Sequence, residues 1–516
     1  MKAEQPARVD TFDRLATAGL LAAVVAIPIT RSITLPIVGP RLTVFELIAL
    51  PSILLWLAAR SLSRSWHTVV VWPKLDVALA AFWGVAALSG VTAYRTLGGT
   101  ALVPFVTELI VLSYLLMFFV TARDLLVRRR ALGSLFDAWA IAALIVGVFG
   151  VAGVYEMLQC APPMSSLVYG NGRLLSTFRN PNQVAAYMVP TVMVFTALWA
   201  SRPTSSLNRL FVPAAVLSVA VLYFCASRGG AIAATAGWIL LIALQRWSSL
   251  LKVIGTLALS VVVLAASSLV IKSAGNTCFA YVGNTVTTLT VQLPLAIRLA
   301  RIISSQAAPP DANVARPAGT GKPRVGGSTA LAGRRSDILE GATTEQGDMI
   351  PRGSDTATSF AFRSVMARIA LRFALEHPFT GIGLGTMHVH VQAATQQQAD
   401  VDAHNMGMTV LAETGFVGLA LFGWSLAYLA WSAFDAFRRS EDPAVRALRA
   451  GLLAALLAYL VMTLSFDGQR QRILWMLMAV IFASLQDGAF GLGGLRVPGT
   501  PRASKATPSS ASASVA

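Results

Sequence analysis

Long runs of apolar residues, separated by short polar loops, fill most of this chain. A helix rises about 1.5 Å per residue, so about 20 apolar residues are enough to cross a hydrocarbon core about 30 Å thick. Twelve segments of this kind predict an all-α polytopic membrane protein. They lie near residues 14–31, 42–59, 75–94, 103–122, 133–157, 183–200, 209–226, 229–245, 249–271, 408–431, 447–465 and 471–487.

The longest break in this apolar pattern lies between the ninth and tenth predicted spans. Residues 284–303 are amphipathic, which is typical of a helix lying on a membrane surface. Residues 306–358 are rich in Ala, Gly, Pro, Ser and Thr, a composition that predicts a disordered insert. Helical periodicity returns at Phe360 and ends at Pro378. We therefore expect an N-terminal membrane region, a large loop, a C-terminal membrane region and a disordered tail, over residues 1–271, 272–407, 408–490 and 491–516.

Composition supports the membrane assignment. Hydrophobic residues make up 55% of the chain and charged residues only 13%, which excludes an ordinary soluble protein. The net charge of +17 would suggest nucleic acid in a soluble protein, but in a membrane protein it first indicates topology and anionic lipid. The first apolar run lacks a small-residue cleavage site, so we interpret it as a retained span rather than a signal peptide.

Lysines and arginines in the short loops predict the orientation of the chain, because cytoplasmic loops are enriched in both. They fall on one side if both termini are cytoplasmic, and the loops 158–182 and 272–407 then face outward. These residues are Arg60, Arg64, Lys74, Arg123, Arg128, Arg129, Arg130, Arg202, Arg209, Arg438 and Arg439.

Several arginines lie on the opposite, outward side and need another explanation. A guanidinium donates paired hydrogen bonds that suit a phosphate or diphosphate. Arg228 is the most informative, because it lies directly between two apolar spans, where charge is costly and usually paired or functional. On a loop helix, Arg368 and Arg372 equally fit headgroup or solvent contacts. The other outward arginines are Arg173, Arg179, Arg363, Arg470 and Arg472.

Four of the five histidines gather between residues 377 and 404. His404 lies at the mouth of an apolar helix, and an imidazole suits general-base chemistry near neutral pH. The alternative is an interfacial histidine that bonds to the backbone at the helix start. His388 and His390 alternate as on a strand or extended loop, and their spacing from His404 matches no specific zinc pattern, so no metal is expected.

Three further features have local explanations. Pro181 favours the first turn of a helix, and Asn182 could cap that helix or contact sugar. Asn405 directly follows His404 and, like His390, is a candidate supporting residue. The glycines of GIGLG lack βαβ context, so they indicate a tight turn rather than a nucleotide site.

Four segments in this order resemble the O-antigen ligase and polymerase superfamily of bacterial inner-membrane glycosyltransferases. They are GRLLSTFRNPNQVAAYM, ASRGG, Arg363 ahead of HPFTGIGLG, and DAHNMGMTVLAETGFVG. The resemblance implies transfer of a glycan from undecaprenyl diphosphate to the lipid A core of lipopolysaccharide, without cofactor or metal. It also implies His404 as the base and Arg179, Arg228 and Arg363 as diphosphate ligands, with Arg173 a weaker addition.

Other functions remain open from the sequence. Within the superfamily, a polymerase would use a second lipid-linked repeat as acceptor, and a protein O-oligosaccharyltransferase would use Ser or Thr. A transporter would explain the number of helices equally well. Against it, the sequence shows no internal repeat and no obvious charged residue deep in a span.

Overall fold

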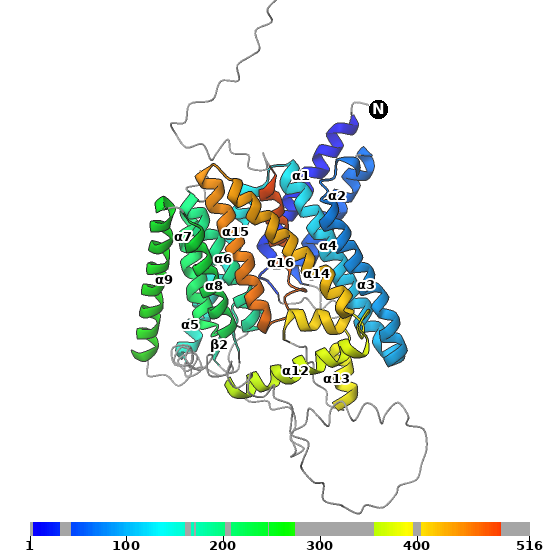
Figure 1. The fold of residues 1–516 in the computed structure, drawn as a ribbon. Coiled ribbons are helices and arrows are strands. Elements are labelled where there is room, and N and C mark those ends of the chain that lie inside the picture. Colours follow the sequence, from blue (N-terminus) through cyan, green and yellow to red (C-terminus); the bar gives the residue numbers. More distant parts are fainter. Residues whose placement is uncertain are drawn as a thin grey trace, which may run out of the picture.

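The computed structural model describes residues 4–30, 43–64, 66–159, 167–169, 172–201, 208–245, 247–273, 356–395 and 404–486. Nearly all of this part of the chain is helical (Figure 1). The amphipathic segment 284–303 and most of the insert predicted near 306–358 lie outside it. The helices are α1 (Glu4–Ala26), α2 (Val44–Ser63), α3 (Pro73–Leu97), α4 (Leu102–Arg128), α5 (Leu132–Gln159), α6 (Pro181–Ser201), α7 (Asn208–Phe224), α8 (Arg228–Leu244), α9 (Trp247–Ser273), α12 (Thr356–Glu376), α13 (Met387–Thr395), α14 (Met406–Arg439), α15 (Pro443–Met462) and α16 (Arg472–Leu485).

Short elements connect these helices. A 3₁₀ turn, η1 (Trp66–Thr68), follows α2, and another, η2 (Gly98–Ala101), joins α3 to α4. Strands β1 (Val168–Tyr169) and β2 (Arg173–Leu174) form a small antiparallel hairpin before α6, which the apolar pattern did not predict. A third 3₁₀ turn, η4 (Thr463–Ser465), begins the connection from α15 to α16.

Each of the twelve predicted apolar segments overlaps a helix, which confirms the all-α polytopic membrane class. Within the described ranges, seven helical runs are long and apolar enough to cross a membrane, one of which, Pro73–Arg128, contains both α3 and α4. Helices α7, α8 and α16 are apolar but shorter. The count of twelve spans stays a prediction.

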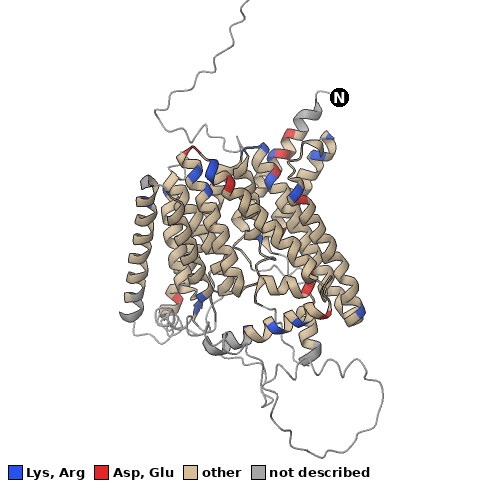
Figure 2. Ribbon diagram, in the orientation of Figure 1, with Lys and Arg blue, Asp and Glu red and all other residues tan. Residues whose placement is uncertain are grey.

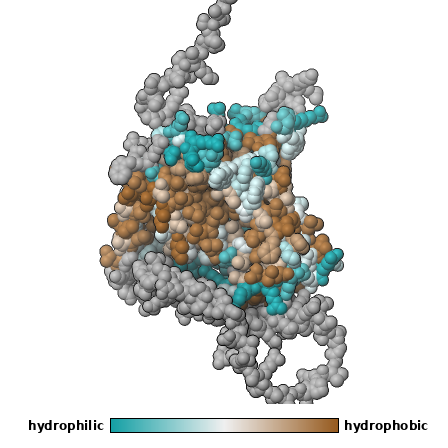
Figure 3. Space-filling view, viewed as in Figure 1, coloured by the Kyte–Doolittle hydropathy of each residue, from teal (hydrophilic) through white to brown (hydrophobic). Residues whose placement is uncertain are grey.

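On the face shown in Figure 3, an apolar band crosses the middle of the bundle, with hydrophilic residues at both ends. Helices α6, α15 and α16 supply much of the buried core. We call the end that carries α12 and α13 the outer end, and the end near the N-terminus the inner end (Figure 1).

The inner end is held by ion pairs between basic and acidic side chains (Figure 2). Arg60 of α2 is almost fully buried and donates to Asp13 of α1 over 2.6 Å. Arg123 near the end of α4 donates to Asp76 of α3 over 2.8 Å. The Arg129 hydrogen bond lowers the pKa of Asp10 below its usual range. Several arginines from which the orientation of the chain was predicted therefore also join the inner ends of neighbouring helices through ion pairs.

Helix α14 is broken at Gly415, whose φ of 70° lies in the left-handed region. A side chain here would meet backbone, since an added Cβ would lie 2.6 Å from the carbonyl oxygen of Pro378. The turn formed by the glycines after Pro378 packs into this break in α14. Ile382 N–H donates to the Ala412 carbonyl over 2.9 Å and Gly383 N–H to that of Glu413 over 3.1 Å. The tight turn predicted from GIGLG is thus confirmed, and it makes residues 406–414 a short separate helix.

One local prediction was wrong. The MHVH segment was expected to be extended, but His388 and His390 lie on helix α13. Four alternating residues are too few to distinguish a strand from one helical turn, and the buried faces of Met387 and Val391, four residues apart, follow helical spacing.

Candidate functional site

His404 lies immediately before α14, at the outer end of the bundle. Its φ of 49° places it in the left-handed region, which is uncommon for a residue other than glycine and concentrates at functional positions. Its side chain is half-buried. The next residue, Asn405, caps α14, because its Oδ1 accepts a hydrogen bond of 3.1 Å from Met408 N–H. Asn405 therefore fixes the start of α14 directly beside His404.

Arg228 is the first residue of α8. Ser227 caps this helix, with its Oγ accepting from Gly230 N–H over 3.2 Å. The first N–H groups of a helix have no intrahelical acceptor and carry the positive end of the helix dipole, so helix starts bind anions. The half-buried Arg228 adds a full positive charge at this place.

The connection between α15 and α16, residues 463–471, lies between these two features. On one side, Asn405 Nδ2 donates to the Leu464 carbonyl over 3.1 Å. On the other, Gly229 lies against Ser465, whose side chain would meet a Cβ at position 229. His404 and Arg228 are far apart in sequence. The residue that follows each of them nevertheless lies against the same turn, at the neighbouring positions Leu464 and Ser465.

Arg173 is held by the protein itself. Its Nε donates to the Cys225 carbonyl over 2.9 Å, and its Nη2 donates to Asn182 Oδ1 over 3.3 Å. Asn182 Oδ1 also accepts from Ser227 Oγ over 3.1 Å. Of the two alternatives for Asn182, capping of α6 does not occur, because the side chain of Asn180 accepts the N–H of Asn182. Asn182 joins the hairpin to the start of α8.

Arg179 lines a cleft of about 440 Å³ between the outer parts of α2, α4 and α6 and the start of α16. We call this the outer cleft. Leu50 and Ile110 on its wall are exposed, as expected for positions facing lipid. Its lining residues are Thr30, Thr43, Glu46, Leu50, Thr107, Glu108, Ile110, Val111, Tyr114, Arg179, Gln183, Arg470, Gln471 and Arg472.

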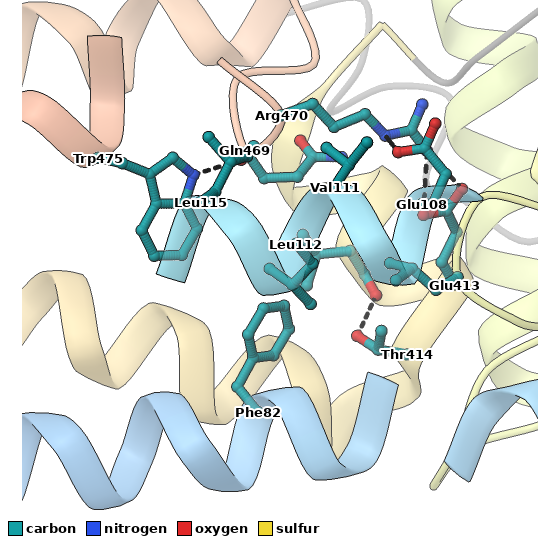
Figure 4. Close-up of a pocket in the computed structure, with 12 residues that line it drawn as sticks. Phe82, Glu108, Val111, Leu112, Leu115, Glu413, Thr414, Gln469, Arg470 and Trp475 are labelled. Atoms are coloured by element: carbon teal, nitrogen blue, oxygen red, sulfur yellow. Dashed lines mark hydrogen bonds and ion pairs between the residues drawn. The ribbon is translucent and has the colours of Figure 1, made fainter. Parts of the chain in front are cut away.

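Two arginines at the start of α16 bind buried carboxylates. Arg470 lies between Glu108 of α4, 3.2 Å away, and Glu413 of α14, 3.0 Å away (Figure 4). Arg472 Nε donates to Glu46 of α2 over 2.7 Å. Glu46 also accepts from Tyr114 over 2.7 Å and from Thr43 N–H over 2.8 Å.

These carboxylates form a buried charge network near the outer ends of three predicted spans. Glu46, Glu108 and Glu413 all fall within predicted spans and are buried. The sequence contains each glutamate, but their basic partners lie far away, 426 residues in the case of Glu46 and Arg472. The apolar pattern of each single segment therefore does not reveal these ion pairs.

Arg363 lies on α12, one turn before the buried stripe of Met366, Ala370 and Phe373. This stripe forms a small second core with Ala412 of α14. Arg363 is half-buried and shares the face of α12 that packs toward α14.

The three outward arginines of α12 lie in two different surroundings. Arg368 is exposed, and Arg372 pairs with Glu376 over 3.3 Å on the exposed side. Both therefore fit the solvent alternative rather than a shared site with Arg363.

His390 is buried, with its ring 5.4 Å from that of Phe373 and its Nε2 3.5 Å from Thr96 Oγ1. It packs α13 against α12 and α3 and does not line the outer cleft. Among the described residues, no group of three or more His, Cys, Asp and Glu could hold a metal ion.

A family model described as O-antigen ligase matches residues 213–423. The matched segment runs from α7 to beyond the break in α14, and it includes Arg228, Arg363 and His404. The match confirms the resemblance to this superfamily over these 211 of the 516 residues. No curated protein matches the chain.

Proposed function

We propose, with the O-antigen ligase family match of residues 213–423 as the premise, that this protein is an inverting O-antigen ligase. It transfers an O-antigen glycan from undecaprenyl diphosphate to the lipid A core, on the periplasmic face of the inner membrane. The enzyme uses no metal or other cofactor. Both termini lie in the cytoplasm.

One observation carries this proposal. The turn between α15 and α16 contacts both the residue after His404 and the residue after Arg228. His404 and the helix start at Arg228 thus lie beside residues that contact one short segment. A glycosyl transfer from a lipid diphosphate needs both, a proton acceptor for the attacking hydroxyl and positive charge for the leaving group.

In the proposed reaction, His404 takes the proton of an acceptor sugar hydroxyl. The hydroxyl oxygen attacks the anomeric carbon of the donor glycan while the bond from that carbon to the diphosphate oxygen breaks. Arg228 and Arg363 stabilise the charge that develops on the departing undecaprenyl diphosphate, whereas Arg179 lines the outer cleft. Arg173, tied to Cys225 and Asn182, supports the start of α8. Single displacement without an enzyme nucleophile predicts inversion at the anomeric carbon.

The base is tested with His404→Asn. Asparagine tolerates the left-handed backbone that His404 adopts, so this variant removes the titratable ring without the strain that alanine would add. We expect transfer between purified donor and acceptor to fall about 10²- to 10⁴-fold. His388→Asn, on the neighbouring α13, is the control and should keep its activity. Full transfer by folded His404→Asn would remove the base from the mechanism.

The acceptor is tested in cells by deleting the protein and examining lipopolysaccharide. A ligase predicts core lipid A without O-antigen and long polymer left on the carrier lipid. Single-repeat chains on the core would instead identify a polymerase. Unchanged lipopolysaccharide together with loss of glycan from a secreted protein would identify a protein O-oligosaccharyltransferase.

A further inference from the structure

We infer that the outer cleft is a glycan subsite, which binds uncharged sugar rings through their hydroxyl groups. This inference rests on the proposed function and adds a binding site to it. The cleft, at about 440 Å³, is within the size range of small-molecule sites. Its lining mixes hydroxyl, carboxamide, carboxylate and guanidinium groups from five separate parts of the chain.

The charges around the cleft argue against a phosphate there. Arg470 is bound between Glu108 and Glu413, and Arg472 is bound to Glu46. A diphosphate in the cleft would compete with carboxylates that already hold these guanidinium groups and would lie near their negative charge. An uncharged ligand meets no such penalty.

The remaining polar groups suit hydroxyl ligands. The buried Oε1 of Gln183 has no hydrogen-bond partner among the described residues. An unpaired buried acceptor is costly, and a sugar hydroxyl is a donor that would satisfy it. Thr107 donates its hydroxyl proton to Val103 over 2.7 Å, which leaves the oxygen lone pairs as acceptors toward a ligand.

The first turn of α6 connects the cleft with the start of α8. Asn182 bonds to Ser227, directly before Arg228, whereas the adjacent Gln183 lines the cleft. One lipid-linked donor could therefore place its diphosphate by Arg228 and its glycan in the cleft. The exposed, lipid-facing Leu50 and Ile110 on the wall provide lateral access for a ligand carried in the membrane.

Direct binding to the full-length protein in nanodiscs tests this inference without requiring transfer. The probes are an oligosaccharide released from the donor glycan, a deacylated and dephosphorylated core oligosaccharide, and inorganic diphosphate. Gln183→Leu and Thr107→Val each remove polar capacity at nearly constant volume. We expect each to weaken binding of one oligosaccharide about three- to tenfold, and to leave diphosphate binding unchanged. Thermal unfolding of each variant establishes that it is folded.

Two matched controls lie away from the cleft. Gln245→Leu removes another glutamine with an unpaired buried amide atom, at the inner end of α8. Thr235→Val removes another threonine bonded to the carbonyl four residues earlier, on the exposed face of α8. Both should bind the probes as the parent protein does.

The probe affected identifies the source of the glycan, donor or acceptor, and either supports the inference. Loss of diphosphate binding with sugar binding intact would overturn it, as would failure of the parent protein to bind either oligosaccharide. These outcomes are independent of the proposed base, because transfer by His404→Asn is measured separately.

Discussion

Arg228 is the residue whose chemistry the sequence indicated best, since a charge between two apolar spans has few structural explanations. The structure adds that it begins a helix whose cap and neighbouring glycine fix its position. We expect Arg228→Lys to raise the donor KM or lower kcat about tenfold or more, because lysine keeps the charge but loses the paired hydrogen bonds. Steady-state kinetics with varied donor measure this.

The matched control is Arg209→Lys, which changes an exposed arginine at the inner end of α7. It should leave both kinetic constants unchanged. Full activity of Arg228→Lys would show that Arg228 acts only as a charge, and full activity of Arg228→Ala would exclude a role in binding the diphosphate.

Arg470 shows what residue-level reasoning from sequence could not find. Its position at an outward helix end suggested phosphate, but the structure places it between two buried carboxylates. Such a network depends on three segments meeting in space, and no local pattern encodes that meeting. The identities of His404 and Arg228 could be proposed from motifs, whereas their shared turn and the outer cleft required the fold.

Replacing Arg470 is expected to destabilise the protein. Arg470→Met leaves Glu108 and Glu413 buried without their cation, and removing one partner of a buried pair costs about 3–5 kcal/mol. We expect a clear fall in the thermal unfolding midpoint. Arg439→Met breaks an exposed pair with Asp435, worth about 0.3–0.5 kcal/mol, and should shift the midpoint little. Equal midpoints for the two variants would refute this view of Arg470.

At the scale of elements, the break in α14 determines where His404 lies. Gly415→Ala forces a side chain into a left-handed position that is already filled by the backbone of Pro378 and Phe379. We expect lower stability and weaker transfer, because residues 406–414 would shift relative to the turn at Leu464. Gly423→Ala, in the straight part of the same helix with open space at its Cβ, is the control. It should be neutral or slightly stabilising.

Elements were predictable where a physical period extended over many residues. Helices α2 to α9 and α14 to α16 follow from apolar runs, and α12 from its helical spacing. Short elements were not predictable from the sequence. The hairpin β1–β2 and the helix α13 each depend on packing against neighbours rather than on their own sequence. The break in α14 also escaped prediction, since Gly415 is one of many glycines in an apolar stretch.

For the whole molecule, the distribution of basic residues predicts that both ends of the chain face the cytoplasm. A green fluorescent protein fused after Ala516 should fluoresce, because this reporter matures in the cytoplasm, and alkaline phosphatase at the same site should be inactive. Alkaline phosphatase inserted near residue 320, in the large loop, should be active. The opposite pattern at both sites would invert the assigned orientation.

The turn at residues 463–471 is synthesised after all helices from α1 to α15. It nevertheless contacts the residues beside His404 and Arg228, and Arg470 in the turn and Arg472 directly after it complete the outer cleft. A nascent chain that has inserted all earlier helices therefore still lacks a finished site. Under the proposed function, no carrier lipid is consumed until α16 has entered the membrane.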